Sequence, residues 1–245
     1  MATNDLDRLR AEYAERDSCA DTRRKYSPFE MANLFALQGR QREVLKALRR
    51  NGFESIDTQD ILELGCGRGG VLFEYLGYGA APDRLHGTDL LPARVRDARR
   101  LLPDVAITCA DGQRLPYKSG SFDLVLQYTV LSSVLDFEVK ANLAREMLRV
   151  LRGPGGRILW YDFWLNPTNP QTRGIRLSEV KKLFPGCHLE VRKITLAPPI
   201  ARLLVPVSWL FSAVLESIKV LNTHYLIVIR PDTRIDQGAV QGHTG

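Results

Sequence analysis

Residues 61–70 read Ile61-Leu62-Glu63-Leu64-Gly65-Cys66-Gly67-Arg68-Gly69-Gly70, a short apolar run that turns at once into a cluster of glycines. The apolar run predicts a buried strand, and a helix is expected after the glycines. Glycines in such a turn let the backbone come close to a ligand, and the start of the helix presents free N–H groups. A ligand site is therefore expected where this strand ends.

Six more short apolar runs follow, each bounded by turn residues, at 85–90, 106–110, 122–130, 157–163, 189–196 and 225–229. Segments with helical periodicity separate the first five runs of the chain, for example at 93–102 and 138–151. Strands that alternate with helices form a mostly parallel sheet, so the sequence predicts a doubly wound α/β domain. The last two runs are separated instead by an apolar segment that contains Pro198, Pro199 and Pro206.

The N-terminal region predicts a helical cover. Ser27-Pro28-Phe29-Glu30 combines a capping hydroxyl, a proline suited to the first helical turn and a glutamate that can complete a capping box, so a helix is expected over about 28–50. We expect three parts: a helical cover or lid at 1–55, the main domain at 56–231, and a flexible polar tail at 232–245.

Composition narrows the function only a little. The 245 residues carry 34 Lys+Arg and 28 Asp+Glu, a net charge of +6, and 44% are hydrophobic, which excludes a disordered or disulfide-stapled chain. Four scattered cysteines and a polar N-terminus favour a cytoplasmic protein with free thiols. The apolar run at 203–215 is too short to span a bilayer, so at most a peripheral membrane contact is expected.

The glycine turn by itself is ambiguous. Gly65, Gly67 and Gly70 also satisfy the dinucleotide fingerprint, with Asp89 following 24 residues after Gly65, so a nucleotide-binding oxidoreductase is one alternative. Glu63 argues against a pyrophosphate and for a ligand that carries an ammonium and a sulfonium. Asp111 closes the third strand, where its carboxylate is well placed for an adenine amino group.

Together, the glycine turn and the acids at 63, 89 and 111 resemble the class I S-adenosylmethionine-dependent methyltransferases, particularly the small-molecule group with a type 11 domain. The resemblance implies the strand order 3-2-1-4-5-7-6 with the last strand antiparallel. It also implies S-adenosylmethionine as cofactor and S-adenosylhomocysteine as product, with the methionine part near residues 63–69, the ribose on Asp89 and the adenine near Asp111. The cofactor site so expected comprises Glu63, Gly65, Cys66, Gly67, Gly69, Asp89, Leu90, Asp111, Gly112 and Gln127.

Each acid also has a purely structural explanation. Glu63 could satisfy buried amides, Asp89 could cap the helix expected near Pro92, and Asp111 could hold a turn. Taken jointly, three acids at the carboxyl ends of successive strands favour a ligand site, because open α/β sheets bind ligands at that edge.

The sequence after strand four differs from that of many members of this family, which have a histidine where this chain has Leu131-Ser132-Ser133-Val134. Asp162 and His224 are expected at one sheet edge, where a carboxylate–imidazole dyad could act as a general base. Tyr128 ends strand four, where it could touch the methionine carboxylate of the cofactor or the acceptor. Buried strand and turn roles for these residues are the structural alternative.

Acceptor contacts are expected from the loop after strand five and from the N-terminal helix. Trp164 and Asn166 combine an aromatic face with an amide and suit a sugar or another polar ring, while Tyr26 and Gln38 belong to the expected lid. Loop rigidity and core packing are the alternatives for these four residues.

The sequence thus predicts methyl transfer, to oxygen or nitrogen, on a small-molecule or glycan-type acceptor. The sequence contains no cluster of carboxylates and histidines that indicates a metal site, so no bound metal is expected. RNA methylation is an alternative that only positive charge motivates, and nucleic acid is disfavoured because Gln127-Tyr128-Thr129-Val130 lacks the amide–proline–aromatic pattern of nucleic-acid amino methyltransferases. A noncatalytic binding module of the same fold is a further alternative. The basic residues behind the RNA alternative are Arg173, Arg176, Lys181, Lys182, Arg192 and Lys193.

Overall fold

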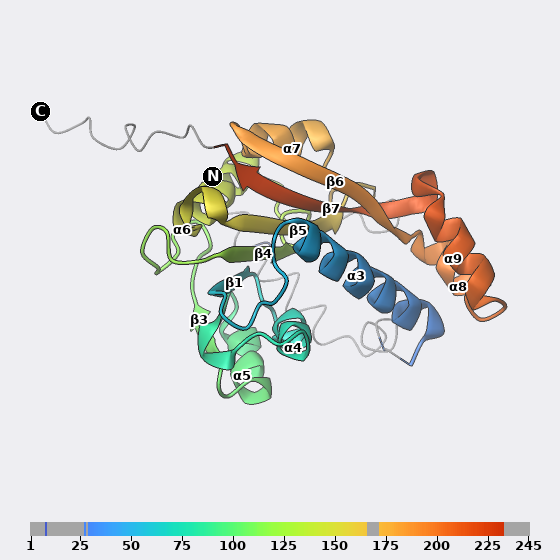
Figure 1. The fold of residues 1–245 in the computed structure, drawn as a ribbon, viewed down its shortest axis with the longest axis horizontal. Coiled ribbons are helices and arrows are strands. Elements are labelled where there is room, and N and C mark those ends of the chain that lie inside the picture. The colour runs from blue at the N-terminus through green and yellow to red at the C-terminus, as the bar shows by residue number, and fades with distance from the viewer. Residues whose placement is uncertain (1–7, 9–26, 28, 166–171, 233–245) are drawn as a thin grey trace, which may run out of the picture.

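The computed structural model describes residues 8, 27, 29–165 and 172–232. Seven strands form one sheet in the order β3-β2-β1-β4-β5-β7-β6, which confirms the predicted topology (Figure 1). β7 pairs antiparallel with both β5 and β6, whereas the other neighbouring pairs are parallel. The strands are β1 Ile61–Leu64, β2 Leu85–Asp89, β3 Ala106–Cys109, β4 Leu124–Tyr128, β5 Arg157–Phe163, β6 Cys187–Leu196 and β7 Asn222–Pro231.

Helices cover both faces of the sheet, as a doubly wound fold requires. One hydrophobic core joins α3, α4 and α5 to one face, and a second core joins α6 and α7 to the other. The helices and their bounds are α3 Met31–Arg50, α4 Gly70–Gly77, α5 Pro92–Leu101, α6 Phe137–Val150, α7 Leu177–Leu183, α8 Pro198–Leu204 and α9 Trp209–Ser217.

The N-terminal helix differs from its prediction in two ways. α3 begins at Met31 and the preceding Glu30 makes no side-chain cap, because the Ser27 hydroxyl instead accepts a bond from the Phe29 amide in a separate turn. The second half of α3 is also more than a cover, since Val44, Ala47 and Leu48 are buried in the core of the main domain. The expected flexible tail at 233–245 lies outside the described residues.

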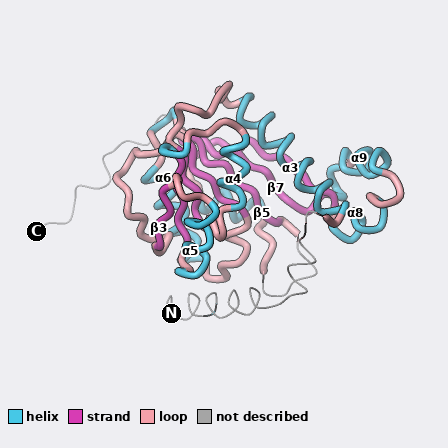
Figure 2. The backbone as a smooth tube through the Cα atoms, turned by 90° about the horizontal axis from the view of Figure 1, so that it is seen from below, coloured by secondary structure: helices cyan, strands magenta, loops and turns pink. Residues whose placement is uncertain are grey.

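The apolar segment between β6 and β7 folds into two short helices, α8 and α9. They form a hairpin that extends beyond the end of the sheet, beside the first turns of α3 (Figures 1 and 2). No helix in the described part of the chain has both the length and the apolar character to cross a membrane.

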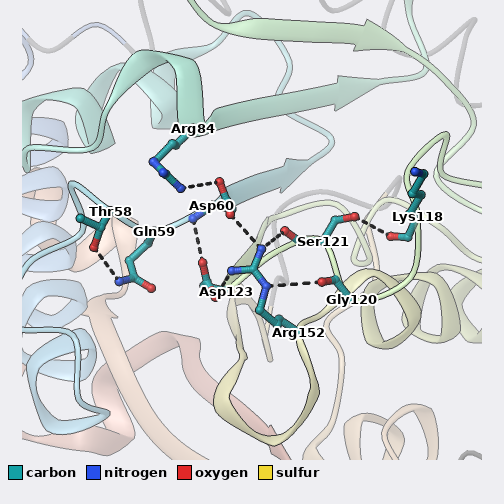
Figure 3. A network of polar contacts seen from close by, with 9 residues as sticks. All are labelled: Thr58, Gln59, Asp60, Arg84, Lys118, Gly120, Ser121, Asp123 and Arg152. Carbon is teal, nitrogen blue, oxygen red and sulfur yellow. Dashed lines mark hydrogen bonds and ion pairs between the residues drawn. The ribbon is translucent and has the colours of Figure 1, made fainter.

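A polar network holds the opposite edge of the sheet together (Figure 3). Asp60, just before β1, takes ion pairs from Arg84 and Arg152, and Arg152 also pairs with Asp123 just before β4. These contacts tie the amino ends of β1 and β4 to the connection before β5. The carboxyl ends of the same strands are left to build the site.

Candidate functional site

A cavity of about 1080 Å³ lies at the carboxyl ends of the central strands. This volume lies just above the usual range for ligand pockets, roughly 300–1000 Å³, and it suits a site that must hold two reactants. Glu63, Asp89 and Asp111 all line it, as do Gly65 and Gly67. The structure therefore brings together the acids that the sequence places far apart.

The glycine turn forms the floor of this cavity. Gly65 has a φ of +72°, and a Cβ there would lie 2.4 Å from the Val130 side chain, so only glycine fits. Gly67 also has a positive φ, of +55°, but a Cβ there would meet no protein atom within 4 Å. Its open side thus leaves the backbone accessible to a ligand. Gly69 differs from the expectation, because it caps α4 with a φ of +85° and packs toward Leu102, outside the cavity wall.

Asp89 joins the glycine turn to the loop after β2. One carboxylate oxygen accepts a hydrogen bond of 2.9 Å from the Gly67 amide, and the other accepts one of 2.9 Å from the Leu91 amide. The neighbouring Leu90 also lines the cavity. Asp89 therefore shapes the turn and faces the cavity at once, so the structural and the ligand-binding explanations apply together.

Glu63 is the most unusual group in the site. It is 2% exposed, and its Oε2 atom has no hydrogen-bond partner among the residues that the structure describes. Burial raises the pKa of the Glu63 carboxyl well above its usual range, and repulsion from Glu74 adds to the shift. A buried acceptor without a partner is costly to the protein, which points to a donor supplied by a ligand.

Asp111 and Gly112 lie where the third strand leads into its loop. The Asp111 carboxylate accepts a hydrogen bond of 2.9 Å from the Gln113 amide, which forms a local turn of the kind aspartate favours. Both residues line the cavity, and a Cβ at Gly112 would press within 2.7 Å of the Leu143 and Leu64 side chains. Cys66 also lines the cavity, and burial raises the pKa of its thiol, so it stays protonated.

Gln127 and Asp162 do not reach the cavity. The Gln127 amide donates a hydrogen bond of 2.9 Å to Asp162 Oδ2, and the same oxygen accepts a bond of 3.1 Å from the Ser132 amide. Both side chains are fully buried on the α6 face of the sheet and neither lines the cavity, so the structure does not place Gln127 where it was predicted to contact the cofactor. Asp162 instead anchors the loop that carries Ser132. Ser132 itself does line the cavity.

The expected dyad of Asp162 and His224 does not form. His224 pairs across the strands with Phe163, one residue beyond Asp162, and side chains alternate between the two faces of a sheet. His224 accordingly stacks on Tyr161, with ring centroids 4.7 Å apart, while its Nδ1 contacts the Thr223 hydroxyl at 3.1 Å. Burial lowers the pKa of His224 to about 3, so its ring is neutral and too weakly basic to serve as a general base.

Tyr128 does line the cavity, and it belongs to a cluster that the sequence analysis missed. The Arg40 guanidinium lies 5.4 Å from the ring centroids of both Tyr128 and Tyr161, and it forms an ion pair with Glu74. Burial raises the pKa of Tyr128 and raises that of Tyr161 to about 12, so both phenols stay protonated. Helical spacing was the signal available: Ala32, Ala36 and Arg40 lie four residues apart, and all three line the cavity.

Of the four residues expected to contact the acceptor, two lie outside the cavity wall and two lie outside the described residues. Gln38 is exposed on another side of α3 and does not line the cavity. Trp164 packs outside it, donating a hydrogen bond of 2.7 Å to the Asn222 carbonyl while Lys193 lies 3.9 Å above its ring. Tyr26 and Asn166 lie outside the described residues. Within the part of the chain that the structure describes, no group of three His, Cys, Asp or Glu side chains is arranged to hold a metal ion.

Comparison with known proteins agrees with this geometry. Residues 62–160 match the family model described as a methyltransferase domain. The chain is 34% identical over 117 residues to the phthiotriol/phenolphthiotriol dimycocerosates methyltransferase of Mycobacterium leprae, a match that covers 47% of this chain and 41% of the relative. It is 31% identical over 136 residues to the norajmaline N-methyltransferase of Rauvolfia serpentina, covering 53% of this chain and 44% of that one. The chain thus spans about half the length, or less, of these relatives.

Solved structures share the fold at low sequence identity. A S-adenosylmethionine-dependent methyltransferase from Mesorhizobium loti superimposes with a TM-score of 0.56 and 19% identity, covering 76% of this chain and 96% of that one. The cyclase SpnF superimposes with a TM-score of 0.55 and 16% identity, covering 80% and 82%. The fold thus occurs both in a protein described as a methyltransferase and in one described as a cyclase, so the reaction must be argued from the site.

Proposed function

Residues 62–160 carry a methyltransferase domain on the class I S-adenosylmethionine-dependent fold, and we propose that the protein transfers a methyl group from S-adenosylmethionine to a small-molecule acceptor. The observation that carries the proposal is the convergence of the glycine turn with Glu63, Asp89 and Asp111 in one cavity. Three carboxylates around a glycine turn suit a cationic ligand far better than a pyrophosphate.

The residues present fit this cofactor. Glu63 has a buried oxygen without a partner, which would accept a hydrogen bond from the cofactor's ammonium. Asp89 would take the ribose hydroxyls with the lone pairs that the Gly67 and Leu91 amides leave free. Asp111 would face the adenine, and the open side of Gly67 leaves room for the ligand to approach. These roles are the ones that the family resemblance implies.

The acceptor would lie toward Arg40, Tyr128, Tyr161 and His224, on the side of the cavity away from Asp111. S-adenosylmethionine supplies a methyl group already activated by a positively charged sulfur, so the protein's task is chiefly to align the acceptor and exclude water. His224 is a neutral, weak base and both tyrosines are protonated, so none of these side chains from the described residues titrates near neutral pH. We therefore propose transfer by positioning, without a general base.

The lining favours a largely apolar acceptor. Rings from Tyr128, Tyr161 and Phe163 and aliphatic groups from Leu196 and Pro198 form much of this part of the cavity, beside the polar side chains of Arg40, Thr195 and His224. The two curated relatives described above are named for small-molecule substrates, which supports the same class of acceptor. Trp164, which motivated a glycan acceptor, lies outside the cavity wall, and so do Lys181 and Lys182 among the basic residues that motivated RNA. Neither alternative is proposed.

Calorimetric titration of the full chain tests the cofactor. S-adenosylhomocysteine should bind with measurable heat, whereas NAD and NADH should give none, because the carboxylates repel a pyrophosphate. Tight nicotinamide binding without S-adenosylhomocysteine binding would overturn the proposal. Incubation with methyl-labelled S-adenosylmethionine and fractionated cell extracts then tests the acceptor, and label confined to RNA or protein fractions would contradict a small-molecule acceptor.

A further inference from the structure

The hairpin of α8 and α9 carries a concentration of exposed apolar side chains. Leu203 is 72% exposed, Val207 81% and Leu210 76%, values that core helices do not show. These residues lie on the hairpin that projects from the end of the sheet (Figure 2). The exposed large apolar side chains of this segment, which we call the hairpin patch, are Leu203, Val207, Trp209, Leu210, Phe211, Val214, Ile218 and Val220.

The opposite side of the same hairpin is firmly packed. Ala201 and Val205 are buried in a small core with Ala32 and Phe35 of α3, and the Phe35 ring meets the Trp209 ring at 5.1 Å. The Ser208 hydroxyl accepts a hydrogen bond of 3.2 Å from the Phe211 amide and so caps α9. The hairpin is therefore a fixed element, and its outward apolar face is a surface left over after the core is complete.

The exposed charges within the hairpin segment have one sign. Arg202 and Lys219 are the exposed charged residues between 198 and 221, and they lie near its two ends. Glu216, the one acid in this segment, is 7% exposed and forms an ion pair with Arg42. A second copy of the chain docked through the same face would bring these cations toward one another, whereas an anionic lipid surface would pair with them.

We propose that the hairpin patch inserts into the surface of an anionic lipid bilayer. Aliphatic and aromatic side chains of this kind bury at the headgroup–acyl boundary, tryptophan favours that boundary, and flanking arginine and lysine reach back to the lipid phosphates. Both helices would lie on the membrane, since neither is long enough to cross it.

The same hairpin forms part of the cavity wall. Pro198, Pro199, Ala201 and Arg202 of α8 line the cavity, while Leu203, the next residue along, belongs to the hairpin patch. A bilayer in contact with the patch would therefore lie beside the acceptor end of the cavity. This step rests on the proposed function: an apolar acceptor would pass from the lipid into the cavity along α8 without crossing water.

Sedimentation with vesicles tests the surface directly. The full chain should sediment with vesicles of phosphatidylcholine and phosphatidylglycerol, and more weakly with phosphatidylcholine alone. The double variant Leu210→Gln/Phe211→Gln should lower the vesicle partition coefficient at least about tenfold, because two large apolar side chains lose their burial in lipid. Lys219→Gln should weaken binding to the anionic vesicles only.

Phe73→Gln is the matched control. Phe73 is an equally exposed aromatic residue on α4, away from the hairpin, so its variant should bind vesicles like the unaltered chain. Failure of the unaltered chain to bind either vesicle, or equal loss in the control, would overturn the proposal. Concentration-dependent dimerisation that the double variant abolishes, without vesicle binding, would identify a second copy as the partner instead.

The affinity for S-adenosylhomocysteine separates this proposal from the function itself. The double variant should bind S-adenosylhomocysteine like the unaltered chain, because neither residue lines the cavity. Vesicle binding without cofactor binding would keep the membrane surface and refute the methyltransferase proposal. Cofactor binding without vesicle binding would refute the membrane surface and leave the methyltransferase proposal standing.

Discussion

The Asp89 carboxylate accepts a hydrogen bond of 2.9 Å from the Gly67 amide, 22 residues earlier in the chain. This bond ties the glycine turn to the end of β2, and Asp89 also lines the cavity. A single side chain thus shapes the loop and lines the cavity in which we propose that the cofactor binds.

Replacing Asp89 should affect both properties. Asp89→Ala should weaken S-adenosylhomocysteine binding by about tenfold to a hundredfold and lower the free energy of unfolding by about 1–3 kcal/mol, because two amides lose their acceptor. Calorimetry and urea denaturation measure the two effects. Asp97→Ala is the control, since Asp97 pairs with Arg68 at the surface of α5 and lies outside the cavity wall. Unchanged cofactor affinity in Asp89→Ala would refute the ribose role.

Glu63 should make cofactor binding depend on pH. In the free protein its raised pKa keeps the carboxyl protonated above the usual glutamate value of about 4.3. A cationic ligand needs the ionised form, so binding releases a proton and the affinity for S-adenosylhomocysteine should rise with pH until Glu63 is ionised without ligand. Glu63→Gln should remove this dependence and bind more weakly at high pH. The same pH dependence in the variant would exclude Glu63 as its source.

The free protein should respond in the opposite direction. Because the folded-state pKa of Glu63 lies above its unfolded value, the contribution of this group to stability is present at low pH and is lost as the pH rises through the folded pKa. Urea denaturation of the unaltered chain and Glu63→Gln over this range measures the difference. A difference that grows as the pH falls would contradict the assigned shift.

Gly67 should be needed for the ligand more than for the fold. Gly67→Ala meets no protein atom but must hold a positive φ, so it should cost about 1–2 kcal/mol of stability and weaken cofactor binding by more than tenfold. Gly52→Ala is matched, because Gly52 also has a positive φ, of +89°, and open space around it, but lies outside the cavity. Equal cofactor affinity in the two variants would show that the open side of Gly67 does not face the ligand.

The ionisation of His224 should change the free energy of unfolding with pH and leave the pH–rate profile unchanged. Its folded-state pKa of about 3 lies below the unfolded value of about 6.5, so the unfolded chain takes up a proton first as the pH falls between these values. His224 therefore costs stability there, by up to about 1.4 kcal/mol per pH unit, a cost that His224→Gln should remove. Urea denaturation at several pH values measures it. A kinetic pKa near neutrality that disappears in His224→Gln would instead restore the general-base role.

The local pattern of apolar residues and glycines along the sequence was enough to predict the α/β architecture of the main domain. The run at 61–64 must be a buried strand, the glycines after it a turn, and alternation of strands with helices a parallel sheet. Since the carboxyl ends of parallel strands meet at one edge, the convergence of Glu63, Asp89 and Asp111 also followed from order along the chain. The strand order itself came from the family resemblance, and the structure confirms it.

Which side chains reach the cavity was a matter of tertiary structure. Asp162 lies near the end of β5 and His224 near the start of the neighbouring β7, but the antiparallel register pairs His224 with Phe163, and the pleat then turns the two side chains to opposite faces. The same alternation hides Gln127 on the α6 face. Arg40 enters the cavity because α3 packs across that end of the sheet, a contact between elements that spacing along one helix cannot supply. The hairpin patch likewise exists only because α8 and α9 need one side for the core, and the packing of the whole molecule selects which side is left outside.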